Sequence, residues 1–294
     1  MNKEFSIGFI GFGEAGSNIA KGLKSAGAMR IFAFDINPDN VRNRAEETRT
    51  PLVESNRVLT ESAEILFSTV TCARAKEAAE QTAPFLKPHH IYADLNSVSP
   101  ALKQEIEKVV APSGAGFVEA AVMSPVTPHG HRSPMLLGGK AATAFKELMM
   151  PLGMRLDVIS ETVGTASATK MFRSIIVKGL EALMLECVLA ASPYGADERV
   201  FSSLSESFPG IDWQRLANYM VGRVVVHGER RAREMEEVAA TLHSLGIEPV
   251  MAEAAARRQD WCASLGISSQ FGPDGPKTYR EALEAIAACT ESHD

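Results

Sequence analysis

The sequence predicts an α/β domain with a doubly wound parallel sheet, followed by an all-helical domain. In the first half of the chain, short apolar runs alternate with helical patterns, which is typical of parallel strands covered by helices. Beyond about residue 160 no clear strand pattern is found, and apolar residues recur at three- and four-residue steps. A chain of 294 residues is long enough for two domains. We therefore expect residues 1–160 to form the first domain and residues 161–294 the second.

The strands of the first domain are predicted from its short apolar runs. They are expected at residues 6–10, 30–34, 65–70, 91–94, 116–122, 135–137 and 155–158, with a further short strand at residues 52–53. Helices are expected between the strands, for example at residues 17–26, 73–83 and 100–110.

The second domain is predicted to begin with a long helix over residues 165–191, which Pro193 and Gly195 end. At a rise of about 1.5 Å per residue this helix is roughly 40 Å long. Later helices are expected at residues 213–227, 229–245, 249–265 and 276–289, with a break between the first two at His227 and Gly228.

A glycine motif, G-x-G-x-x-G, lies where the first strand is expected to turn into a helix. Gly11 permits the tight turn, Gly13 lets the backbone approach a pyrophosphate, and Gly16 allows close helix–strand packing. The first helical turn, with Glu14 and Ala15, supplies free N–H groups and a partial positive charge for phosphates. The alternative is a glycine-rich turn that binds no ligand.

Asp35 ends the second apolar run and completes a dinucleotide-binding pattern. A carboxylate at this position of a Rossmann-type domain accepts hydrogen bonds from ribose hydroxyls and repels a 2′-phosphate. The sequence therefore predicts NAD as the cofactor, with NADP disfavoured.

Val70 and Thr71 lie at the end of the third predicted strand, and Asn96 and Ser97 lie just after the fourth. Ligands of an open α/β sheet bind at the carboxyl ends of its strands, which meet at one edge. We therefore expect Val70, Thr71, Asn96 and Ser97 to lie at the ligand-binding edge of the sheet.

The long helix carries three polar residues, Lys170, Ser174 and Lys178, at successive four-residue steps. This spacing places them on one stripe, among apolar neighbours. Shielding from water would disfavour the ammonium form of Lys170 and suit it to proton transfer. The alternative is a lysine whose charged end is solvated and whose stem is buried.

Three ordered motifs resemble the β-hydroxyacid dehydrogenases, a family that includes 3-hydroxyisobutyrate dehydrogenase and is related to 6-phosphogluconate dehydrogenase. They are GFIGFG at residues 8–13, DLNSVSP at residues 94–100, and Gly164 with Lys170 six residues later. The resemblance spans about residues 5–190. The segments HGERRA at residues 227–232 and EMEE at residues 234–237 resemble a phosphogluconate-dehydrogenase-like branch, DUF1932.

The resemblance implies roles for these residues. Gly11, Gly13, Gly16 and Asp35 would bind the adenosine half of NAD, and Val70 and Thr71 the nicotinamide half. Lys170 matches the family's catalytic lysine, which takes the hydroxyl proton while hydride leaves the same carbon. Asn96 and Ser97 stand where the family carries polar residues that hydrogen-bond substrate near the nicotinamide, so Asn96 would contact both cofactor and substrate. The polar stripe adds Ser174 as a catalytic candidate and Lys178 as a substrate-binding candidate.

Two departures from the family pattern point to a reshaped substrate pocket. Ser174 stands where the family usually has asparagine, and a hydroxyl makes fewer hydrogen bonds than an amide. The family's loop D-A-P-V-S-G-G is EAAVMSP at residues 119–125, where Met123 and Ser124 are the substrate-binding candidates. The glycine pair is absent, and Pro125 lacks a backbone donor.

Several other residues are given structural interpretations. His129 and His131 form H-x-H without a third ligand nearby, so we expect a solvated loop and no metal. Trp213 and Tyr219 are expected in the core. The arginines on the later helices are expected mostly at the surface; they are Arg223, Arg230 and Arg231.

Composition limits the possible partners. A net charge of −6 provides no broad basic surface for nucleic acid. The four cysteines show neither C-x-x-C nor metal-ligand spacing. No signal-peptide pattern or transmembrane run is found, so we expect a cytoplasmic protein that does not bind membranes. The long helix and apolar tail suggest a homodimer, as the resemblance also implies.

Together these features predict an NAD-dependent oxidoreductase that acts on the hydroxyl of a small β-hydroxyacid, with lysine as acid and base. One alternative is an NAD(H)-binding protein without catalysis, since fold does not fix function. Another is an imine or ketone reductase, which the presence of Lys170 disfavours.

Overall fold

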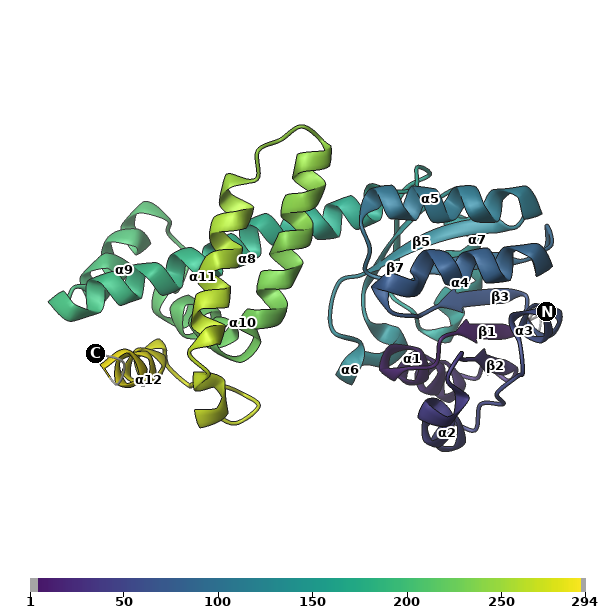
Figure 1. Cartoon of the computed structure of the whole chain (residues 1–294), viewed down its shortest axis with the longest axis horizontal. Coiled ribbons are helices and arrows are strands. Elements are labelled where there is room, and N and C mark those ends of the chain that lie inside the picture. The colour runs from purple at the N-terminus through teal and green to yellow at the C-terminus, as the bar shows by residue number, and fades with distance from the viewer. Residues whose placement is uncertain (1–4, 292–294) are drawn as a thin grey trace. The chain divides into compact units, whose positions relative to one another are not determined.

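The computed structural model describes residues 5–291 and divides into two compact units, Met1–Lys170 and Met171–Asp294 (Figure 1). The division falls at residue 170 rather than at the expected residue 160. The backbone N–H groups of Gly164, Ala166 and Ser167 donate to Glu119 of the sheet, and this accounts for the later boundary.

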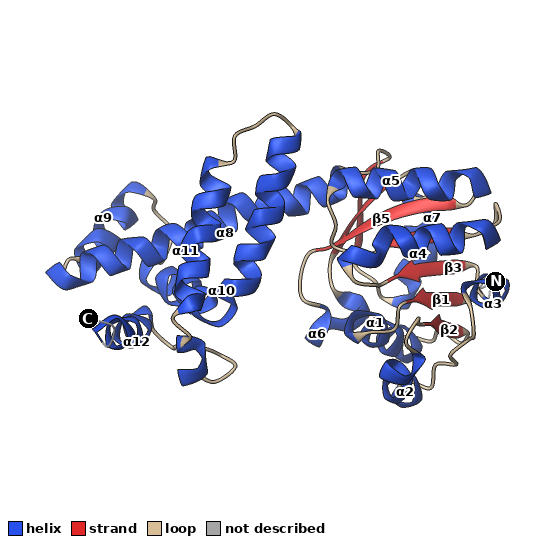
Figure 2. Ribbon diagram, in the orientation of Figure 1, coloured by secondary structure: helices blue, strands red, loops and turns tan. Residues whose placement is uncertain are grey.

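The first unit contains one seven-stranded sheet in the order β2-β1-β3-β4-β5-β6-β7 (Figure 2). All neighbours are parallel except β5 and β6, which are antiparallel. The strands are β1 (Ile7–Ile10), β2 (Ile31–Phe34), β3 (Ile65–Ser68), β4 (Ile91–Asp94), β5 (Gly116–Val122), β6 (Met135–Gly138) and β7 (Leu156–Ser160). The expected strand at residues 52–53 is absent, since Leu52 forms only an isolated bridge with Ala33.

Alternating side chains of the strands build a core on each face of the sheet. Phe9 and Phe67 stack at 5.2 Å on the face covered by α1 (Glu14–Ser25), α2 (Pro38–Glu47) and α7 (Ala142–Met149). Leu66 and Tyr92 lie on the face covered by α3 (Asn56–Ser62), α4 (Ala75–Thr82) and α5 (Pro100–Val110). The predicted doubly wound fold is therefore confirmed.

The second unit is helical throughout its described residues. Its helices are the later part of α8 (Thr165–Ala191), α9 (Asp197–Ser207), α10 (Trp213–Ser244), α11 (Val250–Ser264) and α12 (Tyr279–Glu291). Buried Leu185, Val221 and Tyr279 belong to its main core. No helix among residues 5–291 is both long and apolar enough to cross a membrane.

The expected break at His227 and Gly228 is wrong, because both residues lie inside α10, a continuous helix of 32 residues. Gly228 instead permits close helix packing: a Cβ atom there would lie 2.8 Å from the carbonyl oxygen of Gln259 in α11. Gly228 is therefore needed for the close contact with α11, and it does not end α10.

We expect Gly228→Ala to lower the free energy of unfolding by about 1–3 kcal/mol, because the added methyl group meets backbone rather than a flexible side chain. Gly179→Ala in α8 is the matched control, since nothing lies within 4 Å of its added Cβ. The control should be neutral or stabilising by up to about 1 kcal/mol. Urea unfolding followed by tryptophan fluorescence measures both; equal effects of the two variants would contradict the packing role.

Two surface or core assignments also differ from expectation. Tyr219 is not in the core, because 59% of its surface is exposed. Arg231 is buried, and its guanidinium lies 2.5 Å from a carboxylate oxygen of buried Glu181. Burial raises the pKa of Glu181, although Arg231 and Arg223 oppose that shift. A helix read alone does not show which of its charged residues a neighbour covers.

Candidate active site

The glycine turn after β1 has the geometry of a nucleotide-binding turn. Gly11 has φ +84°, and a Cβ there would lie 2.7 Å from a methyl carbon of Val70. A Cβ on Gly16 would lie 2.7 Å from the hydroxyl oxygen of Thr69. No atom lies within 4 Å of a Cβ built on Gly13. The outer glycines are therefore required by packing, whereas Gly13 borders the space in which a phosphate would approach.

Asp35, which directly follows β2, connects the end of this strand to the glycine turn by a hydrogen bond. One carboxylate oxygen accepts the Phe12 N–H at 2.8 Å, and the other accepts the Asn37 N–H at 2.9 Å. Each oxygen keeps further acceptor capacity for a ligand hydroxyl. The carboxylate is thus fixed beside the turn, where it lines the neighbouring cavity.

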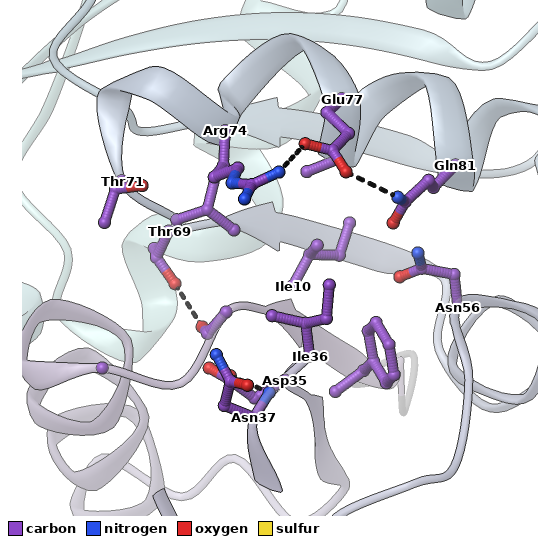
Figure 3. A pocket seen from close by; sticks show the side chains of 15 residues that line it. Ile10, Asp35, Ile36, Asn37, Asn56, Thr69, Thr71, Arg74, Glu77 and Gln81 are labelled. Atoms are coloured by element: carbon purple, nitrogen blue, oxygen red, sulfur yellow. Dashed lines mark hydrogen bonds and ion pairs between the residues drawn. The ribbon is translucent and has the colours of Figure 1, made fainter. Parts of the chain in front are cut away.

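A cavity of about 470 Å³ lies beside the turn (Figure 3). One wall comes from β1 and β2 and the residues that follow them, including Ile10 and Asp35. The opposite wall carries Arg74, Glu77 and Gln81. The Glu77 carboxylate accepts hydrogen bonds from both the Arg74 guanidinium and the Gln81 amide. The complete lining is Ile10, Gly11, Gly13, Phe34, Asp35, Ile36, Asn37, Asn56, Thr69, Val70, Thr71, Arg74, Glu77, Ala78 and Gln81.

A buried ion pair holds the segment after β4. Lys103 of α5, 1% exposed, donates to a carboxylate oxygen of Asp94 at 2.5 Å and to its carbonyl at 2.8 Å. The same carboxylate oxygen accepts the Asn96 N–H at 2.9 Å. The Asn96 amide donates to the Ser68 hydroxyl at 2.9 Å, and its buried Oδ1 has no partner among the described residues. Asn96 therefore offers a fixed acceptor to a ligand.

Lys170 and Ser97 meet within the first unit. The Lys170 ammonium nitrogen lies 2.6 Å from the Ser97 hydroxyl oxygen, although 73 residues separate the two. Lys170 is half-buried and Ser97 is exposed. The structure thus places the predicted lysine beside the polar segment that follows β4.

Glu119 of β5 positions the first turn of α8, which carries Lys170. One carboxylate oxygen accepts the N–H groups of Gly164 and Ala166 at 2.7 and 2.9 Å. The other accepts the N–H and hydroxyl of Ser167 at 3.3 and 2.9 Å. The fully buried carboxylate accepts hydrogen bonds from all four donors. It therefore satisfies N–H groups that the start of the helix leaves without intrahelical partners.

The segment after β5, where Met123 and Ser124 are half-buried, turns toward α1. The Ser124 hydroxyl is enclosed without a hydrogen-bond partner in the described chain. Beyond it, Thr127 donates to the carboxylate of Glu14 at 2.9 Å. Glu14, expected at the phosphate-binding turn, is therefore also a contact for this loop.

The expected solvated loop is wrong at His131, which is buried against α1. A Cβ on Gly22 would lie 2.0 Å from its Nδ1 atom, so the glycine makes room for the ring. Burial and nearby Arg132 lower the pKa of His131. Among residues 5–291, no cluster of three or more histidine, cysteine or acidic side chains could hold a metal.

Ser174 and Lys178 lie in the second unit and contact each other. The Lys178 ammonium nitrogen is 3.1 Å from the Ser174 hydroxyl oxygen and 2.6 Å from a carboxylate oxygen of Glu234. Lys178 is buried, and Gln259 donates to its carbonyl at 3.1 Å. Their roles toward a substrate stay predictions.

Three residues that shape the site were not among the predicted ones: Asn56, Lys103 and Glu119. The sequence signal for Glu119 is an acidic residue within an apolar strand. Lys103 lies on the apolar stripe of α5, and Asn56 begins a helix. The Glu119 signal does not identify its partners, which lie 45 or more residues away, and the Asn56 signal does not identify the cavity that this residue lines. Lys103 pairs with Asp94 only nine residues earlier, but no local pattern shows that this ion pair is buried.

The residues present fit a dinucleotide. Gly13 borders open space beside the amino end of α1, and Asp35 supplies carboxylate oxygens at the mouth of the cavity. Asn96 adds a buried acceptor at the end of β4. This set provides space for phosphate, an acceptor for ribose and an acceptor for a polar group farther along the sheet edge.

Family comparisons agree with this geometry. Residues 6–158 match the family described as the NAD binding domain of 6-phosphogluconate dehydrogenase. Residues 191–262 match a domain of unknown function, DUF1932. The first unit is therefore an NAD-binding domain.

Three similar proteins are informative. A conserved hypothetical protein from Sinorhizobium meliloti 1021 has 34% sequence identity and a TM-score of 0.87, with 97% of each chain covered. A conserved protein of unknown function, described as structurally similar to 3-hydroxyacid dehydrogenases, has 29% identity and a TM-score of 0.78, covering 88% of this chain and 97% of that one. Mitochondrial 3-hydroxyisobutyrate dehydrogenase of Drosophila melanogaster is 24% identical, covering 71% of this chain and 65% of that protein.

The sequence motifs, the nucleotide-binding fold and these matches agree over both parts of the chain. The chain therefore belongs to the β-hydroxyacid dehydrogenase-like family, in the branch that carries a DUF1932 domain after its NAD-binding domain.

Proposed function

We propose that the chain is an NAD-dependent oxidoreductase that oxidises the hydroxyl group of a β-hydroxyacid or reduces the matching carbonyl. The observation that carries the proposal is the 2.6 Å contact between the amine of Lys170 and the hydroxyl of Ser97. The contact supports proton transfer by Lys170 because Ser97 follows β4, and β4 pairs with β3, whose end reaches the nucleotide cavity at Thr69 and Val70. The 3-hydroxyisobutyrate dehydrogenases among its relatives support the substrate class.

In this mechanism the uncharged amine of Lys170 accepts the hydroxyl proton of the substrate. The carbon–oxygen bond becomes a carbonyl as the hydrogen on that carbon leaves with its electron pair. Bound NAD supplies the acceptor for this hydride. In the reverse direction the Lys170 ammonium returns the proton, and its charge stabilises the developing alkoxide.

Other residues prepare this step without taking part in bond changes. Ser97 directs the Lys170 amine through their hydrogen bond. Glu119 fixes the helical turn that precedes Lys170. Asn96, held by Asp94, offers its free amide oxygen to the substrate hydroxyl or to the carboxamide of the cofactor.

The test is a panel of 3-hydroxy acids incubated with NAD, with formation of reduced nicotinamide followed by absorbance. The proposal expects at least one acid to be oxidised and the product carbonyl to be reduced by NADH. If no acid, alcohol or imine is converted while NAD still raises the melting temperature, a binding protein without catalysis replaces the enzyme. If imines alone react, the reductase alternative replaces it.

We also propose NAD as the preferred cofactor over NADP. The parent should bind NAD about ten-fold or more tightly, because Asp35 would face the added 2′-phosphate as a like charge. Asp35→Ala should weaken NAD binding and reduce the ratio of the Kd for NADP to the Kd for NAD. Calorimetry measures both Kd values.

Asp39→Ala is the matched control for charge, since Asp39 is exposed, pairs with Arg42 and does not line the cavity. It should leave the ratio of the two Kd values unchanged. Equal affinity of the parent chain for NAD and NADP would contradict the role given to Asp35.

The proposal includes a homodimer in the cytoplasm. Within the second unit, Ile176, Leu180 and Leu183 of α8 are substantially exposed and apolar. Their spacing places them on one side of the helix, a pattern that suits burial against a second copy.

A further inference from the structure

One polar side chain that lines the cavity beside the glycine turn is buried, and its contacts within the described protein do not account for its hydrogen-bonding capacity. Asn56, the first residue of α3, is 6% exposed and lines the cavity. Its amide oxygen is buried and has no hydrogen-bond partner among residues 5–291. Figure 3 shows that oxygen directed from the side of the cavity toward its interior. An enclosed carbonyl without a donor costs free energy unless a ligand supplies one.

The neighbouring polar groups are already engaged or exposed. Gln81 donates to Glu77, which also pairs with Arg74. Thr69 donates to the carbonyl oxygen of Gly11. Among the lining residues, all of which fall in the described range, Asn56 alone combines a polar side chain with burial.

The surroundings of Asn56 suit a flat aromatic base. Apolar side chains of Ile10, Phe34, Val70 and Ala78 line the same cavity. Asp35 stands at the end of β2, where ribose hydroxyls would be bound. A base attached to that ribose would enter the space into which the Asn56 oxygen points.

We propose that Asn56 recognises the adenine base of the dinucleotide, an inference that rests on the NAD binding in the proposed function. Its amide oxygen accepts a hydrogen bond from the exocyclic amino group, and its amide nitrogen donates to an adjacent ring nitrogen. This donor and acceptor pair is the one with which asparagine distinguishes adenine elsewhere. The ring nitrogen is N7, and at this edge hypoxanthine and guanine present the O6 carbonyl beside N7, so Asn56 would face two acceptors.

The experiment compares calorimetric Kd values of the full chain for NAD and for nicotinamide hypoxanthine dinucleotide. We expect the parent to bind NAD about ten-fold or more tightly, the discrimination typical of one amide–adenine pair. Asn56→Leu, similar in volume, should reduce the ratio toward one. Asn56→Asp keeps an acceptor in place and should retain most of the preference for adenine.

Asn40→Leu is the matched control, because Asn40 is an exposed amide on α2 that does not line the cavity. It should leave the ratio unchanged. A parent chain that binds both dinucleotides equally overturns the role of Asn56 and leaves the proposed dehydrogenase intact. A parent that binds neither overturns both proposals. Unchanged discrimination in Asn56→Leu, or an equal loss of discrimination in Asn40→Leu, also overturns the inference.

Discussion

Replacing Lys170 by alanine is expected to reduce oxidation of a 3-hydroxy acid by about 10²–10⁴-fold, the usual contribution of a positioned proton-transfer group. NAD affinity should stay within a few-fold of the parent, because Lys170 is absent from the cavity beside the glycine turn. The measurement is kcat from the formation of NADH, with Kd for NAD determined separately by calorimetry.

Two further variants separate proton transfer from charge. Lys170→Arg keeps a positive group that cannot deprotonate, so its kcat should also be low. Lys76→Ala removes a surface lysine that pairs with Glu105 and should behave as the parent. Full turnover by either Lys170 variant would contradict the assignment of this lysine as acid and base.

Replacing Glu119 by alanine is expected to have the largest effect on stability. It leaves the donors of Gly164, Ala166 and Ser167 without their acceptor inside the first unit. Each buried donor without a partner costs about 1–3 kcal/mol, so we expect a loss of at least about 3 kcal/mol. Urea unfolding followed by circular dichroism measures it, and hydrogen exchange should show faster exchange of these three amides.

Two other variants test whether the carboxylate acts at this place. Gly138→Ala should mimic the loss in part, since a Cβ there would lie 2.4 Å from a Glu119 carboxylate oxygen. Glu105→Gln removes an exposed carboxylate paired with Lys76 and should leave the free energy of unfolding close to that of the parent. Unaltered exchange at the start of α8 in Glu119→Ala would refute the capping role.

Elements with strong local signals could be predicted from the sequence to the residue. Strand β5 and helix α5 have the expected bounds, as does the long helix α8. Helix α5 begins at Pro100 after Ser99, whose hydroxyl accepts the Leu102 N–H, so its start is encoded locally. Such signals need no knowledge of the tertiary fold.

Features that depend on distant partners could not be predicted in the same way. Gly228 carries the local pattern of a helix break, yet its absent side chain accommodates α11. His131 stands in a polar segment, yet Gly22 of α1 makes room for its ring. Asn56 and Lys103 acquire meaning only from the cavity and the ion pair to which the fold brings them. The periodicity of a segment does not show which other segments of the chain will pack against it.

The most direct test of the account is a crystal structure of the chain with NAD and a 3-hydroxy acid. We expect the nicotinamide ring near Asn96, with the substrate hydroxyl within hydrogen-bond reach of the Lys170 amine. A nicotinamide ring held at another edge of the sheet, with the Lys170 amine directed into solvent away from it, would contradict the account.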